Sequence, residues 1–190
     1  MYKTLIILIH IVLLSSNAHA IDYDPLLMRA QATIFPKIIL LDKDLDSKLE
    51  KNEIVIEILH SEEERKIALT IKSLIENKYK DKLGNKSLII KLNDFESFNT
   101  KSIVTAYFIL KGSSDIHNKI TAHASANKRL VFCYDHTDFK SNTLISLLMK
   151  EKTYIYLNKS AIHNYDINFL PLFYKIVKVI EWRTFLYLLK

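Results

Sequence analysis

The sequence predicts an α/β fold, a single compact layered domain with a mixed sheet of about five strands and helices packed on it. Three observations carry this prediction. The chain has 190 residues, which is the length of one typical domain. Its hydrophobic fraction is 49% and its charged fraction is 25%, as in soluble globular proteins. Runs rich in β-branched residues alternate along it with amphipathic helical patterns.

The first twenty residues have the three parts of a secretory signal peptide. Lys3 gives a basic start, residues 5–14 form an apolar run, and Ala18 and Ala20 place small residues at alternate positions. The run is shorter than the roughly 20 residues that cross a bilayer, although an uncleaved anchor is the alternative. We therefore expect cleavage after Ala20, export, a domain over residues 21–190, and no membrane span after cleavage.

The first helix of that domain begins at Asp24 and Pro25, which suit an N-cap and the first helical position. Apolar residues then recur at helical spacing, and Pro36 is expected to kink or end the helix. Charge is dense over residues 42–52, which predicts a solvated loop. The following segment, Glu53–Leu59, is β-branched and predicts a buried strand.

The clearest helix follows. Ser61 and Glu64 form a capping-box pattern, and residues 67–79 carry one apolar stripe opposite a charged face. Two further strands are expected over Ser87–Leu92 and Ile103–Leu110.

The second half of the chain continues the alternation. A break at residues 112–115 starts a helix that runs to about Ala124. Strands are expected over Arg129–Tyr134 and Thr153–Leu157, with Tyr154 and Tyr156 on one face, whereas Thr143–Met149 fits a helix or a strand. A last helix is expected from Pro171 to about Leu189, and its charged residues argue against a membrane span.

Composition excludes several functions. Two glycines cannot build a glycine-rich nucleotide loop. The net charge is +6, but arginine occurs at only four positions. Arginine is the residue that forms bidentate hydrogen bonds with phosphates and base edges. We expect no nucleic acid partner. The single cysteine, Cys133, lies in an apolar run and is expected to be buried and inert, so no disulfide forms within the chain.

One polar cluster has metal-ligand chemistry. Cys133, Asp135, His136 and Asp138 supply thiolate, imidazole and carboxylates at the end of a predicted strand. Their spacing matches no established ligand pattern, so we expect no metal and no cofactor, and a metal-dependent hydrolase using Asp135, His136 and Asp138 is only a rival hypothesis. His117 and His123 lie six positions apart on one helix and are expected to be solvated polar residues.

The tail over residues 185–189 is wholly apolar or aromatic. It is expected either to dock on the core or to form a partner surface through Phe185, Tyr187 and Leu188.

The stretch from residue 130 to residue 180 resembles the YfiR family of small exported proteins. The resemblance lies in a strand that leads to an acidic turn and a phenylalanine, an apolar segment, a strand that ends in asparagine, and an apolar terminal helix. The residues that carry it are Tyr134-Asp135-His136-Thr137-Asp138-Phe139, Leu144-Ile145-Ser146-Leu147, Tyr154-Ile155-Tyr156-Leu157-Asn158, Ala161 and Ile167. The chain departs from the family at Ser141-Asn142-Thr143, where glycines are usual, and it lacks the paired cysteines of some members.

The resemblance implies a non-enzymatic periplasmic regulator that contacts the external domain of an inner-membrane signalling protein, typically a diguanylate cyclase. It supplies no catalytic residue. A periplasmic small-molecule binding module is the alternative, and a homodimer remains open.

Overall fold

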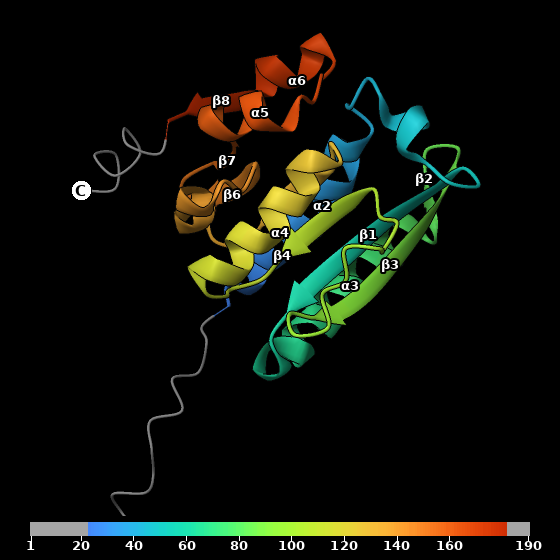
Figure 1. The fold of residues 1–190 in the computed structure, drawn as a ribbon, viewed down its shortest axis with the longest axis vertical. Helices are drawn as coiled ribbons and strands as arrows, with labels where there is room; N and C mark the ends of the chain where they lie inside the picture. Colours follow the sequence, from blue (N-terminus) through green and yellow to red (C-terminus); the bar gives the residue numbers. More distant parts are fainter. Residues whose placement is uncertain (1–22, 182–190) are drawn as a thin grey trace, which may run out of the picture.

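The computed structural model describes residues 23–181 (Figure 1). The predicted signal peptide, residues 1–20, and the predicted partner residues Phe185, Tyr187 and Leu188 lie outside this range. In chain order the elements are α2 (Pro25–Ile39), β1 (Glu53–His60), α3 (Arg65–Tyr79), β2 (Lys82–Leu83), β3 (Lys86–Asp94), β4 (Ala106–Ile109), α4 (Ser114–Ala126), β5 (Leu130–Cys133), β6 (Ile145–Met149), β7 (Thr153–Asn158), α5 (Lys159–Tyr165), α6 (Pro171–Ile176) and β8 (Val177–Ile180).

The fold is α/β, as predicted, with helices packed on a mixed sheet, but the sheet has eight strands where about five were expected. Their order is β2-β3-β1-β4-β5-β6-β7-β8. The five central strands, from β3 to β6, are parallel, whereas β2 and β7 run antiparallel to β3 and β6. The chain moves outward from β1 to β3 and then returns to the other side of β1 at β4. This single reversal is the arrangement of doubly wound α/β domains.

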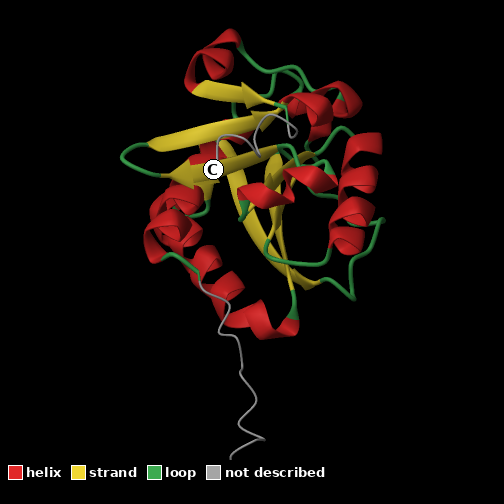
Figure 2. Cartoon of the chain, turned by 90° about the vertical axis from the view of Figure 1, so that its left-hand side faces the viewer, coloured by secondary structure: helices red, strands yellow, loops and turns green. Residues whose placement is uncertain are grey.

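Helices cover both faces of the sheet (Figure 2). Phe35 of α2 stacks on Phe132 with ring centroids 4.5 Å apart and meets Phe108 edge-on at 5.1 Å. The Tyr107 side chain points to the opposite face of the sheet from Phe108, because side chains alternate along a strand. It contacts His123 of α4 there. Thus α2 lies on one face and α4 on the other, and both bury apolar side chains against the parallel strands.

Local signals explain the first two long helices. The Asp24 carboxylate accepts a hydrogen bond from the Leu26 N–H at 2.8 Å, and Pro25 takes the first helical position. The helix passes through Pro36 and continues to Ile39. The Ser61 and Glu64 capping box is confirmed, although a short 3₁₀ turn separates it from α3.

Two other sequence predictions were wrong in part, and one helix was not predicted. The segment over residues 42–52 contains a 3₁₀ turn, Leu45–Lys48, in which Lys48 pairs with buried Asp42 at 2.5 Å, so the segment is not fully solvated. Helix α5 has no counterpart among the predicted elements, and the Asn158 side chain supplies its N-cap. The expected long helix from Pro171 ends at Ile176, and β8 extends the sheet beside β7, since Val177 and Val179 are β-branched and find a strand partner.

The ambiguous segment near residue 145 is strand β6, and Tyr154 and Tyr156 share a face, as expected, with ring centroids 6.3 Å apart. Within residues 23–181, no helix combines the length and the apolar character that a membrane crossing requires.

Candidate functional site

An open cleft of about 760 Å³ lies at the carboxyl ends of β1, β3 and β4. These are the strands on either side of the reversal in strand order. Loops that leave neighbouring strands in opposite directions separate at such a reversal, and the crevice between them is where open α/β sheets bind ligands. The topology of the sheet therefore places this cleft where a site is expected.

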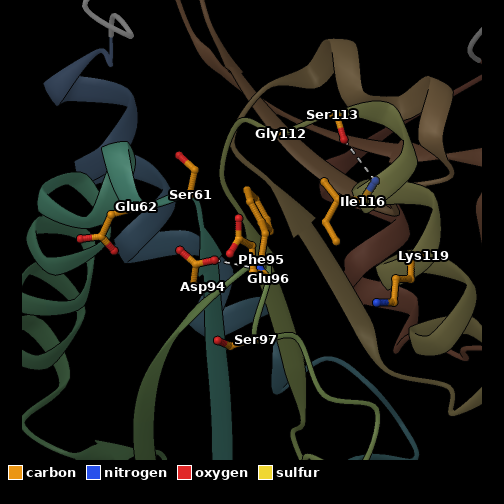
Figure 3. Close-up of a pocket in the computed structure, with 10 residues that line it drawn as sticks. All are labelled: Ser61, Glu62, Asp94, Phe95, Glu96, Ser97, Gly112, Ser113, Ile116 and Lys119. Atoms are coloured by element: carbon orange, nitrogen blue, oxygen red, sulfur yellow. Dashed lines mark hydrogen bonds between the residues drawn. The ribbon is translucent and has the colours of Figure 1, made fainter.

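Three segments line the cleft (Figure 3). They are the turn after β1, the loop after β3, and the beginning of α4 after β4. The lining residues are Ser61, Glu62, Asp94, Phe95, Glu96, Ser97, Gly112, Ser113, Ile116 and Lys119.

The turn after β1 is held by the capping box. Glu64 is buried, and one of its carboxylate oxygens accepts from the Ser61 N–H at 3.0 Å and from the Ser61 hydroxyl at 3.2 Å. The adjacent Glu62 is exposed and is one of the lining residues, and Figure 3 places it at the outer edge of the cleft, beyond Ser61 and Asp94 from Phe95. A rigid cap thus presents a solvent-exposed carboxylate at the rim of the cleft.

The loop after β3 places an aromatic ring in the middle of the cleft. The Phe95 N–H donates to the His60 carbonyl at 2.9 Å, which ties this loop to the end of β1. The Asp94 carboxylate accepts from the Glu96 N–H at 2.8 Å and closes a turn around the same residue. Phe95 is half-buried, so one part of its ring packs on the protein and another part borders the open space.

Gly112 makes the close approach of Phe95 possible. A Cβ atom at this position would lie 2.9 Å from the His117 Nε2 atom and 3.1 Å from the edge of the Phe95 ring. Either neighbour would have to move to admit it. Gly112 is one of only two glycines in the chain, and its role is steric because it lets ring and backbone meet at the cleft.

The third wall is the start of α4. The Ser113 hydroxyl accepts from the Ile116 N–H at 3.4 Å and caps the helix. Ile116 and Lys119 follow on the side that faces the cleft in Figure 3. The Lys119 ammonium lies 5.8 Å from the centroid of the Phe98 ring, which it approaches by a cation–π contact.

A buried polar pair lies behind this wall. The His117 Nδ1 atom is 3.5 Å from an Asp138 carboxylate oxygen, and its Nε2 atom is 3.1 Å from the Leu110 carbonyl. Burial raises the pKa of the Asp138 carboxyl to about 7, and burial also lowers the pKa of the His117 imidazole. Both groups are therefore held toward their uncharged forms near neutral pH.

A second buried set joins the start of α2 to the strand ends. The Tyr23 hydroxyl donates a short hydrogen bond to Glu64 and accepts from the Lys111 N–H at 3.2 Å. The Lys111 ammonium lies 4.9 Å from the Tyr23 ring centroid and 5.6 Å from that of Tyr134. Burial raises the pKa of the Tyr23 hydroxyl, so it remains a hydrogen-bond donor. These contacts make the turn after β1 rigid.

The structure keeps only two residues of the predicted metal-type cluster together, since the His136 Nδ1 atom lies 3.6 Å from an Asp135 carboxylate oxygen, whereas Cys133 and Asp138 have other partners. Cys133 is buried and its thiol donates to the Thr143 hydroxyl at 3.3 Å, while burial raises the pKa of that thiol. Asp135 instead caps a 3₁₀ turn through the Thr137 N–H, and Asp138 faces His117. Within the described residues, no group of three or more histidine, cysteine or acidic side chains is placed to hold a metal ion.

The structure corrects the prediction for His117. This residue was expected to be solvated, but its exposed fraction is 0% because α4 turns it inward over the end of β4. His123 is half-buried against Phe98 and Tyr107 instead of being fully solvated. The burial of Cys133 is confirmed.

Sequence reasoning missed the cleft residues Phe95, Glu96 and Gly112. One signal was present, because Gly112 lies between a predicted strand and a predicted helix in a chain with almost no glycine. The position of Phe95 depends on the neighbouring strand order, which short-range patterns do not contain.

A second surface feature lies at the other end of the sheet. Five large hydrophobic side chains between residues 170 and 179 are exposed, with exposed fractions from 40% to 58%. We call them the apolar face; they are Leu170, Leu172, Tyr174, Ile176 and Val179. They lie on α6, on β8 and at the residue that precedes α6.

Comparison with known proteins supports the fold. No family model matches the chain, and no curated protein matches it. The crystal structure of a conserved domain protein from Vibrio cholerae O1 biovar El Tor superimposes with a TM-score of 0.55 at 10% identity, over 83% of this chain and 60% of that one. An ABC domain from Streptococcus pneumoniae in complex with L-Trp gives a TM-score of 0.50 at 11% identity, over 75% of this chain and 60% of that one. This chain spans three-fifths of the length of each neighbour, and the likeness is one of fold.

Proposed function

We propose that this chain is a non-enzymatic exported binding protein that takes a small organic ligand into the cleft at the ends of β1, β3 and β4. One observation carries the proposal, namely an open cleft of about 760 Å³ at the reversal in strand order, with an aromatic ring held inside it. A volume of this size suits a metabolite or another small organic molecule.

Other features agree with this proposal. Backbone hydrogen bonds and a capping box fix the loops around the cleft, so little ordering is needed when a ligand binds. The neighbour from Streptococcus pneumoniae was solved in complex with L-Trp, which is a molecule of the size that this cleft admits.

Native mass spectrometry tests the proposal. The full-length chain is expressed with its own N-terminal segment, isolated without unfolding, and weighed before and after denaturation. We expect a small molecule that leaves on denaturation, and we expect the Phe95→Ala variant to lose it while Leu172→Ser keeps it. A wild-type protein that carries no molecule and shows no thermal shift with any member of a metabolite library would overturn the proposal.

The apolar face favours a second candidate function, the regulation of a membrane protein by protein contact. Contiguous exposed hydrophobic side chains commonly mark a protein interface, and the five of the apolar face fall within ten consecutive residues. The YfiR-like segment described above includes β8 and suggests the partner, the external domain of an inner-membrane signalling protein such as a diguanylate cyclase.

Affinity capture from the native envelope tests this second candidate. The tagged wild type should recover a membrane signalling protein, whereas Leu172→Ser combined with Val179→Ser should not. The Phe95→Ala variant is the matched control, because its substitution lies in the cleft and leaves the apolar face unchanged. Equal recovery by the wild type and the double variant would count against the apolar face as the contact.

A further inference from the structure

We propose that the cleft selects a ligand of net positive charge, an organic amine whose charged nitrogen faces three carboxylates and whose apolar part lies on Phe95 and Ile116. This inference rests on the proposed function and names the ligand class of the same site. We call Glu62, Asp94 and Glu96 the acidic wall.

The first argument is charge. Three of the four formally charged side chains that line the cleft are the carboxylates of the acidic wall, and the fourth is Lys119. The whole chain carries a net charge of +6, so the cleft has the opposite sign from the protein around it. A crevice lined with one sign of charge concentrates ligands of the other sign.

The second argument is that the acidic wall is largely uncompensated. Within residues 23–181, neither Asp94 nor Glu96 forms an ion pair with a lysine or arginine. Glu62 lies 3.7 Å from Arg65, but both side chains are mostly exposed, so this pair is weak. A positively charged ligand would therefore meet two carboxylates that form no ion pair with a lysine or arginine and a third whose ion pair is weak and exposed.

The third argument is the position of the aromatic ring. Asp94 and Glu96 flank Phe95 in the sequence, and Figure 3 shows the acidic wall on one side of the ring and Ile116 across from it. An ammonium group is attracted to the face of an aromatic ring as well as to carboxylates. The apolar part of the same molecule can pack against Phe95 and Ile116, so one ligand satisfies both surfaces.

An anionic ligand fits this cleft less well. Lys119 stands alone among the lining residues as a cation, and its ammonium lies 5.8 Å from the Phe98 ring centroid. The Ser113 hydroxyl already accepts one of the free N–H groups at the start of α4. A carboxylate or phosphate in the cleft would meet the acidic wall without a matching set of cations.

A series of indole compounds with one apolar body and different charges tests the inference. Isothermal titration of the full chain at low ionic strength compares tryptamine, L-Trp, indole and indole-3-propionate, which are cationic, zwitterionic, neutral and anionic. We expect tryptamine to bind at least about tenfold more tightly than indole-3-propionate, with L-Trp between them, and to weaken as salt is added.

Matched variants locate the effect. Glu62→Gln combined with Glu96→Gln should weaken tryptamine binding by about three- to tenfold and leave indole binding unchanged, because these exposed carboxylates act through charge. Glu151→Gln, an exposed acid in the turn between β6 and β7, should change neither. Both variants lie at exposed positions and should fold like the wild type.

Two outcomes would overturn the inference. The first is that indole-3-propionate binds as tightly as tryptamine or more tightly, which shows that the ligand class is wrong although the cleft binds a ligand. The second is that none of the four compounds binds, which also rejects an amine on an apolar body of this size. The native mass of the protein then decides the proposed function separately, since a retained molecule of another class would support the cleft alone.

Discussion

The cleft and the apolar face differ in the side chains that form them, although both lie on the same sheet. The cleft lies at the parallel strands β1, β3 and β4, where hydrogen-bonded loops surround a recess of mixed polar and aromatic character. The apolar face lies on α6 and β8, at the end of the sheet, and consists of exposed aliphatic and tyrosine side chains. The difference shows how one small domain can separate a surface suited to a small molecule from a surface suited to a protein.

The largest expected effect comes from a substitution in the hydrophobic core that underlies both regions. Phe35→Ala removes a ring that stacks on Phe132 and contacts Phe108, with an exposed fraction of 2%. The lost burial and the cavity should lower the free energy of unfolding by about 3–5 kcal/mol. Urea unfolding measures this, and ligand and partner binding should both fall with it. A loss below about 1 kcal/mol would show that the packing between α2 and the sheet is not part of a common core.

A second test concerns the polar layer behind the cleft. The folded chain holds the pKa of Asp138 near 7, above its ordinary value of 3.8, so between these values the folded state binds more protons than the unfolded state. The contribution of Asp138 to stability therefore falls as the pH rises from about 4 to about 7. Asp138→Asn should remove this fall and raise the free energy of unfolding at pH 8 by about 2 kcal/mol.

Urea titrations at pH 4, 6 and 8 measure the effect of Asp138→Asn. The variant should then gain stability as the pH rises toward 6.5, because burial lowers the pKa of His117 and the folded state resists its protonation. Asp115→Asn, at an exposed position on the same helix as His117, is the control. Parallel pH profiles for the wild type and Asp138→Asn would show that Asp138 is ionised in the folded chain.

Substitutions at the two glycines distinguish an effect on the cleft from an effect on stability alone, and each should cost less stability than Phe35→Ala. Gly112→Ala forces a Cβ atom against His117 and Phe95, whereas Gly84→Ala makes only ordinary contact with Leu40 at 3.9 Å but must keep a φ of +65°. Each substitution should cost about 1–2 kcal/mol, the first by crowding and the second by strain. Only Gly112→Ala should change ligand retention in the native mass spectrum. Equal retention by both would mean that the cleft tolerates a displaced Phe95 ring.

The smallest effect on stability is expected at the apolar face. Leu172→Ser replaces a side chain with an exposed fraction of 58%, so the free energy of unfolding should change by less than about 0.5 kcal/mol. Phe173→Ala, next to it, removes a buried ring packed 4.0 Å from Phe169 and should cost about 3–5 kcal/mol. Thermal unfolding of both variants measures this contrast. A large loss in Leu172→Ser would indicate that this side chain is already covered in the wild type.

Local signals predicted much of the fold because they act within a few residues. The cap at Asp24, the capping box at Ser61 and the β-branched strand β1 were all readable from the sequence, and the structure contains each. The end of the last helix was not readable, since β8 forms only where β7 offers it a strand partner. Tertiary contacts decide such segments.

The candidate site was less predictable than the fold. Phe95 and Gly112 lie 17 positions apart, and they meet only because β3 and β4 lie on opposite sides of β1. The burial of His117 likewise depends on the Leu110 carbonyl and on Asp138, which come from two other segments. The members of the polar cluster near residue 135 are close in sequence, but the fold pairs only His136 with Asp135 and directs Cys133 and Asp138 to other partners.

Cys133 gives the chain a reporter of its own. It is the only cysteine, it lies on β5 in the middle of the sheet, and its exposed fraction is 0%. A thiol reagent can reach it only when the neighbouring strands separate, and burial already disfavours the reactive thiolate. The rate at which the unmodified protein is alkylated therefore measures how often the centre of the sheet opens, and a bound ligand or partner that slows the reaction stabilises the closed sheet.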